Sequence, residues 1–223
     1  MNITVALNFL KKLEKNNNRE WFADNKPEYE KALKEVKGLY NEVYSGMQVH
    51  DEFEKMKVFR IYRDVRFSKN KQPYKTNFGA AFHRVKPRLR GGYYLQIQPG
   101  NSFIATGFWS PEKEDLLRIR KEFEMDDQEV RDIITNPKLQ SVWGELQGEE
   151  LKTAPRDFDK THPAIDLIKK KQFIFSKQFT DAEVIAEGFA QKVSDDFKTI
   201  RPFFDYMSDV LTTDLNGVSL IKD

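Results

Sequence analysis

Three segments between residues 76 and 109 are joined by connections too short to contain a crossover helix. Residues 76–85, 93–98 and 102–109 have the composition and alternation typical of β-strands. The turn signal Gly91-Gly92 lies between the first and second of these segments, and Pro99-Gly100-Asn101 lies between the second and third. Parallel neighbours need a connection of about a dozen residues or more. We therefore expect an antiparallel meander, which limits the possible folds more than any other feature of the chain.

Helical periodicity flanks this meander on both sides. Apolar side chains recur every three or four residues in 3–14, 28–48 and 189–211, and Pro202 predicts a kink or break in the last of these. Shorter helices are expected over 128–135 and 137–143, and another from 110 to about 123 with Ser110 as its N-cap.

Period-two alternation over 58–62 predicts a first strand with Phe59 and Ile61 facing the helices, and residues 172–179 are a candidate additional strand. The sequence thus predicts a single α+β domain over 1–223. Its antiparallel sheet, from about 57–109 with 172–179 as the candidate addition, is packed on one face by the N- and C-terminal helices.

One face of the predicted sheet should carry polar and aromatic side chains. If Phe82, Leu95 and Ile97 face the core, alternation puts His83 and Tyr94 on the opposite face. Gln96 and Gln98 follow Tyr94 on that face. This face is a candidate ligand site.

Composition restricts the class of protein. The 223 residues are 39% hydrophobic and 32% charged, with no apolar run long enough to span a bilayer and no cysteine. A folded, soluble, cytoplasmic protein without membrane partners is expected, and disulfides, thiol nucleophiles and thiolate metal sites are excluded. Three scattered histidines predict no metal site, and the sequence names no cofactor.

The segment Arg60–Arg90 concentrates positive charge. It holds ten Lys and Arg residues and one acid, Asp64. Subtracting them from the 37 basic and 35 acidic residues of the chain leaves 27 basic against 34 acidic residues. The near-neutral chain therefore contains a local basic block, which favours binding of an anion.

Guanidinium groups and ammonium groups suit phosphate and carboxylate ligands, and aromatic rings beside them suit nucleotide bases. We therefore expect an anionic small molecule or single-stranded nucleic acid as partner. The candidate ligand-binding residues are Arg60, Arg63, Asp64, Arg66, Lys71, Tyr74, Lys75 and Arg156. Asp64 would hold an arginine in position. The alternative is that the same basic groups pair with the acidic helices and serve only the fold.

Three motifs resemble those of the bacterial and fungal proteins grouped as domain of unknown function 2461. They are Asn18-Arg19-Glu20-Trp21-Phe22, Arg60 through Ser68 followed by Pro73-Tyr74-Lys75, and Leu151 through Arg156. The resemblance covers essentially the whole chain and implies one α+β domain, with no established activity. Asp157 stands where this family usually has glycine, which argues against a tight turn there.

Two other functions remain open. An enzyme acting on a phosphorylated small molecule could use Asp64 as general base and His83 or His162 as acid. A protein-interaction module could use tryptophan anchors, the candidates being Trp21, Trp109 and Trp143. No P-loop, dinucleotide-binding or serine-hydrolase motif is present.

Overall fold

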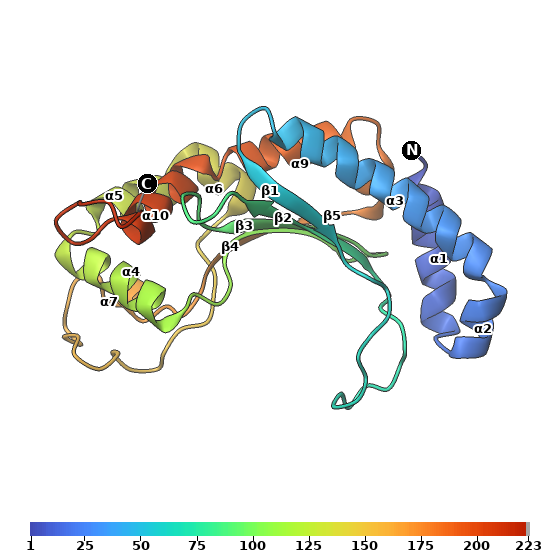
Figure 1. Cartoon of the computed structure of the whole chain (residues 1–223), viewed down its shortest axis with the longest axis horizontal. Coiled ribbons are helices and arrows are strands. Elements are labelled where there is room, and N and C mark those ends of the chain that lie inside the picture. The colour runs from blue at the N-terminus through green and yellow to red at the C-terminus, as the bar shows by residue number, and fades with distance from the viewer. Residues whose placement is uncertain (222–223) are drawn as a thin grey trace.

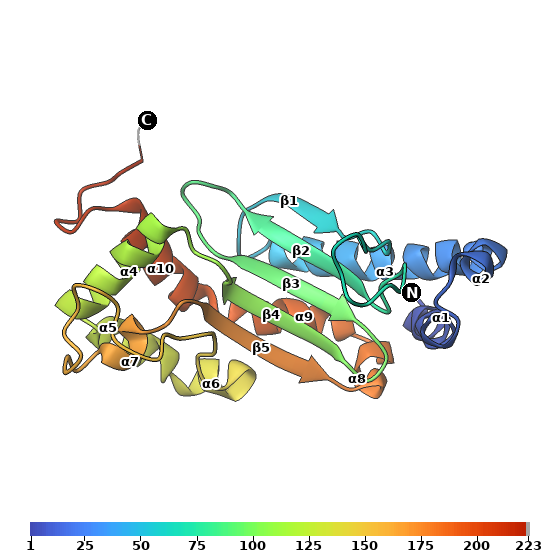
Figure 2. The same cartoon turned by 90° about the horizontal axis from the view of Figure 1, so that it is seen from below.

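The computed structural model describes residues 1–221. Its strands form one antiparallel sheet in chain order, as Figure 2 shows face-on. They are β1 (Phe53–Val58), β2 (Phe78–Arg84), β3 (Gly92–Ile97), β4 (Ser102–Phe108) and β5 (Phe173–Phe179). The expected meander is confirmed, and the candidate strand over 172–179 is its fifth member.

Helices precede the sheet, interrupt it between β4 and β5, and follow it. The first group is α1 (Ile3–Lys15), α2 (Arg19–Asp24) and α3 (Lys26–Met47). The second is α4 (Lys113–Met125), α5 (Gln128–Ile134), α6 (Pro137–Trp143) and α7 (Ile165–Ile168). The third is α8 (Asp181–Ile185), α9 (Phe189–Lys198) and α10 (Arg201–Thr212). The α+β class is confirmed, and the break expected at Pro202 lies between α9 and α10.

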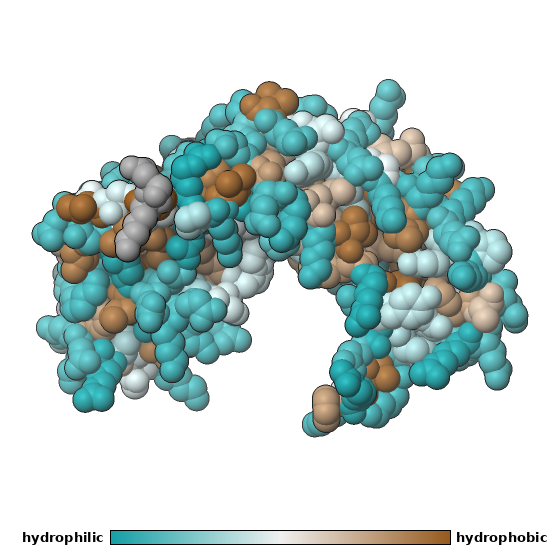
Figure 3. Space-filling model, viewed as in Figure 1, coloured by the Kyte–Doolittle hydropathy of each residue, from teal (hydrophilic) through white to brown (hydrophobic). Residues whose placement is uncertain are grey.

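Within residues 1–221, helices cover only one face of the sheet. In Figure 1, α3 and α9 lie above the sheet, while no helix lies beneath its middle. Phe82, Leu95 and Ile97 point toward the helices and are fully buried, as expected from alternation. His83 and Tyr94 lie on the other face, which we call the open face. The molecule is therefore an arch, and the space-filling view in Figure 3 shows it hollowed underneath.

The first strand lies earlier than the sequence indicates. β1 ends at Val58, and residues 59–77 form a long excursion, here called the basic loop, with one isolated bridge between Tyr62 and Tyr74. Its partner β2 begins only at Phe78, so residues beyond Phe59 have no ladder to join. Phe59, which directly follows the strand, lies on the open face, contrary to expectation. Ile61 is buried, as expected.

The start of α4 also differs from expectation. The helix begins at Lys113, with Glu112 rather than Ser110 at the N-cap and no side-chain cap hydrogen bond. Residues 110–112 are used to turn the chain out of β4, so they cannot belong to the helix. No helix within residues 1–221 is long and apolar enough to cross a membrane.

Candidate functional site

The open face contains a cavity of about 630 Å³ at the centre of the sheet. Cross-strand pairing aligns Lys57, Ala81, Tyr94 and Ala105 in one row of side chains. The next row along the strands comprises Lys55, His83, Gly92 and Gly107. Small residues therefore occupy two positions in each row, on either side of Tyr94 in the first row and next to His83 in the second. We call Ala81, Gly92, Ala105 and Gly107 the small-residue floor of the cavity.

Aromatic rings stand on two sides of this floor. Gly79 leaves room for the ring of Tyr94, because a Cβ at Gly79 would lie 2.5 Å from the Tyr94 hydroxyl. Turned this way, Tyr94 packs between Phe59 and Phe103, with ring centroids at 6.1 and 5.6 Å. On the other side, Trp109 lies beside Gly92. The cavity is thus a slot with a flat floor and aromatic walls.

His83 brings a titratable group to the cavity. It is half-buried, and its Nε2 is buried without a hydrogen-bond partner among the described residues. Burial lowers the pKa of this imidazole, and the positive charge of Lys55 lowers it further. The neutral ring is therefore favoured near pH 7.

The basic loop is fixed at its base to the N-terminal helices. The Asn17 side chain accepts a hydrogen bond from the Tyr74 amide at 3.1 Å and donates one to the Tyr74 carbonyl at 3.0 Å. The Tyr74 ring stacks on Phe22, with centroids 3.9 Å apart, and is only 6% exposed. Tyr74 is thus a structural residue at the base of the loop.

Four positive side chains gather where the loop meets the sheet: Lys57, Arg60, Arg63 and Lys75. The ammonium groups of Lys57 and Lys75 lie 5.3 and 5.4 Å from the centroid of the Phe59 ring. Burial lowers the pKa of Lys75, and the charges of Arg60 and Arg63 lower it further. None of the four forms an ion pair with another residue in 1–221. We call them the cationic cluster.

Other predicted site residues interact within the loop itself. The Arg66 side chain donates to Asp64, with Nη2 and Oδ2 2.6 Å apart, and this hydrogen bond lowers the pKa of the carboxyl group. Lys71 donates to the Val65 and Arg66 carbonyls. Asp64 therefore orients Arg66, and none of these three side chains joins the cationic cluster.

Arg156 lies away from the other predicted site residues. Figure 1 shows its segment, 144–164, and the basic loop descending at opposite ends of the sheet. Arg156 is 95% exposed at its side chain, and its closest acid is Asp157 at 3.8 Å. The sequence argues against a tight turn at Asp157, because glycine is missing there. The structure nevertheless has this turn, and the φ of Asp157 is +69°. Aspartate is among the residues that tolerate this left-handed conformation.

The remaining histidines and tryptophans occupy structural positions. His162 accepts a hydrogen bond from the Ala164 amide through Nδ1, and His50 contacts the Ser194 carbonyl through Nε2. Trp143 is 2% exposed, and Trp21 packs against the core. Only Trp109, which is 37% exposed, belongs to the open face. Within residues 1–221, no group of three His, Cys, Asp or Glu side chains is arranged to hold a metal ion.

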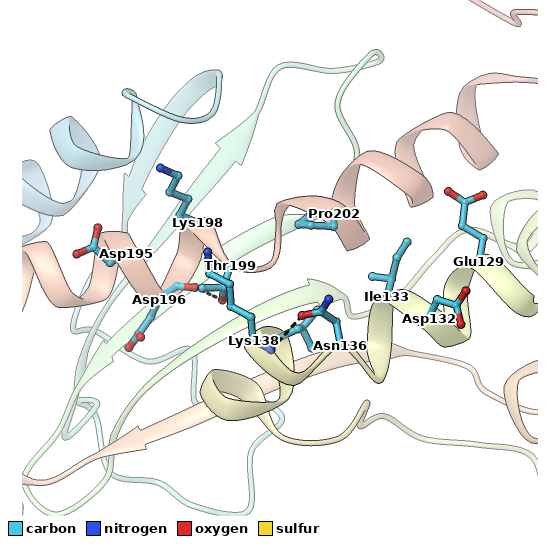
Figure 4. Close-up of a pocket in the computed structure, with 11 residues that line it drawn as sticks. Glu129, Asp132, Ile133, Asn136, Lys138, Asp195, Asp196, Lys198, Thr199 and Pro202 are labelled. Atoms are coloured by element: carbon cyan, nitrogen blue, oxygen red, sulfur yellow. Dashed lines mark hydrogen bonds between the residues drawn. The ribbon is translucent and has the colours of Figure 1, made fainter.

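A second cavity, of about 760 Å³, opens on the outer surface between α5–α6 and α9–α10 (Figure 4). Some of its polar groups already have partners. Asp196 pairs with Lys177 at 2.7 Å, Asn136 caps α6, and Thr199 accepts a hydrogen bond from the Trp143 indole. The charged residues that line it have both signs, so the larger volume does not come with a group of like charges.

A buried charge network lies on the helix side of the sheet. Arg84 and Asp51 have fully buried side chains, and Arg84 Nε lies 2.8 Å from Asp51 Oδ2. The Tyr93 hydroxyl donates to the same oxygen at 2.6 Å. The Arg84 side chain also donates to the Arg90 carbonyl and lies over the Phe204 ring. These contacts compensate both charges internally, so the network serves the fold.

Comparison with models of protein families shows which family the chain belongs to. The model described as "Conserved hypothetical protein (DUF2461)" matches residues 5–206. The chain belongs to the DUF2461 family. Neither a search of curated proteins nor a search of solved structures gave a match.

Two of the three motifs meet in space at the base of the basic loop. Phe22 from the first motif stacks on Tyr74 from the second, next to Asn17. The sequence indicated this basic region and the polar face of the sheet, but none of the residues of the small-residue floor was among the predicted site residues. A detectable signal was the small side chain at Ala81, Gly92 and Ala105, which alternation places on one face of three neighbouring strands.

Proposed function

We propose that the open face binds an anionic ligand, bearing phosphate or carboxylate, whose charge is held by the cationic cluster. The observation that carries this proposal is that Lys57, Arg60, Arg63 and Lys75 gather beside Phe59, a wall of the cavity, without an ion-pair partner among the described residues. Like charges repel, so this arrangement favours a bound anion. The cytoplasm is the compartment we propose, in line with a chain of 223 residues without cysteine.

An enzyme acting on the bound anion is the second candidate. His83 supports it, because this imidazole lines the cavity and has an unpartnered Nε2. Asp64 does not support it as a general base, because its carboxylate is already bound to Arg66 in the exposed loop. Binding is the simpler function and is tested first.

The test is calorimetric titration with nucleotides, sugar phosphates and polycarboxylates, comparing the wild type with Lys75→Gln. A charge-assisted contact contributes about 1.5–3 kcal/mol, so the variant should bind at least roughly tenfold more weakly. Lys69→Gln is the matched control, since it removes one exposed charge from the same loop and should change affinity by less than about twofold.

Equal weakening by the two substitutions would mean that only the net charge of the loop matters, which contradicts a defined site. Salt dependence separates the two partner classes. Single-stranded oligonucleotides lose affinity steeply as salt rises, because each phosphate contact releases counterions. A ligand of the cavity should show a much shallower dependence.

A further inference from the structure

The slot above the small-residue floor constrains the uncharged part of the ligand. Its floor has no side chain larger than a methyl group at Ala81, Gly92, Ala105 and Gly107. The fold itself requires glycine at position 107, since a Cβ there would lie 2.0 Å from the Phe173 carbonyl oxygen of β5. A Cβ on Gly92 would meet only Trp109 Cζ3, at an ordinary 3.8 Å, and the Phe82 carbonyl at 4.0 Å. At Gly92, therefore, a methyl group would meet no steric obstacle.

The walls of the slot suit a flat, unsaturated ring. The Tyr94 ring lies over Gly79 and not over Gly92, which leaves the floor uncovered between Tyr94 and Trp109. Aromatic side chains interact favourably with planar rings by stacking and edge contacts. A volume of about 630 Å³ is also in the range of small-molecule sites.

Charge around the slot is unequal. The cationic cluster lies at the β1 side, where Phe59 is both a wall of the cavity and the ring beneath the two ammonium groups. Asp115 also lines the cavity and pairs with Arg90. Lys86 and Glu112 are further charged residues of the lining and have opposite signs. An anionic group is thus favoured beside β1, where the charge is of one sign, and a group without net charge over the rest of the cavity.

We infer that the open-face cavity takes a ligand with a planar ring joined to an anionic group, the chemistry of a nucleoside monophosphate. The ring lies on the small-residue floor between Tyr94 and Trp109, and the anion contacts the cationic cluster. The imidazole of His83 lines the same cavity. This inference rests on the proposed function and names the ligand class for the same site.

The experiment compares AMP, CMP, GMP and UMP with ribose 5-phosphate and inorganic phosphate by calorimetric titration at fixed salt. We expect at least one nucleotide to bind about tenfold or more tightly than ribose 5-phosphate. Ala81→Leu should abolish this advantage by filling the floor, so that nucleotides and ribose 5-phosphate bind with similar affinity. Gln178→Leu is the matched control, because this exposed residue lies on the same face outside the cavity and should preserve the advantage.

If Ala81→Leu does not fold, Trp109→Ala removes one wall and should reduce the advantage of the nucleotide in the same way. Equal affinities for nucleotides and ribose 5-phosphate would overturn the inference and leave anion binding in place. No binding of any anion, nucleotides included, would overturn the proposed function itself. Binding confined to single-stranded oligonucleotides, with no mononucleotide bound, would overturn the assignment of a small-molecule ligand.

Discussion

Two basic residues only four positions apart have different roles in this molecule, one in the core and one on the surface. Arg84 points toward the helices and is compensated by Asp51, whereas Arg88 is exposed and pairs with Glu52. Removing one member of a buried pair leaves an uncompensated charge in the core, while an exposed pair contributes little. Charge density along the sequence cannot distinguish these cases, because the difference is made by burial.

Asp51→Asn should therefore lower the free energy of unfolding by about 3–5 kcal/mol, since the neutral amide leaves the buried charge of Arg84 uncompensated. Glu52→Gln, at the next position, should change it by less than about 0.5 kcal/mol. Urea denaturation of both variants measures the difference. Similar effects for the two substitutions would contradict a structural role for the buried pair.

At the scale of elements, the basic loop is an extension whose base is held by residues far away in the sequence. Asn17 pairs with both backbone groups of Tyr74, and the loop closes with Arg63 N donating to Pro73 O and Lys75 N donating to Ile61 O. This closure holds Arg63 and Lys75 beside the sheet. The position of the cationic cluster therefore depends on Asn17, which carries no charge.

Asn17→Ala should lower the free energy of unfolding by about 1–3 kcal/mol, because it leaves the Tyr74 backbone groups unpaired. Hydrogen exchange at the Arg63 and Lys75 amides should accelerate more than exchange in β3. Asn70→Ala is the control, since this exposed side chain contacts only Gln72. Unchanged exchange in the loop of the Asn17 variant would show that other contacts hold it.

Most of the sheet is predictable from the sequence because alternation and short turns act locally. The three strands from β2 to β4 and the inward direction of Phe82 and Leu95 follow from them. The end of β1 was not predictable, since it depends on where the distant partner β2 begins. The stacking of Tyr74 on Phe22 was similarly not predictable, because it joins residues far apart in the sequence.

The whole molecule leaves one sheet face uncovered and places a cavity on it. Figures 1 and 3 show the basic loop and the segment 144–164 bordering this hollow, with the helical layer on the other side. Antiparallel sheets commonly bury one face and solvate the other. Here the uncovered face combines aromatic walls, a floor of small residues and uncompensated positive charge, which together favour ligand binding over a merely solvated surface.

The most direct test of this account is the position at which a ligand binds, measured by amide chemical-shift changes in ¹⁵N-labelled protein titrated with AMP. We predict saturable shifts at Ala81, Gly92 and Lys75, and unchanged signals at Glu129 and Thr199 of the outer cavity. Shifts confined to the outer cavity would contradict the account, because the ligand would then bind away from the cationic cluster and the small-residue floor.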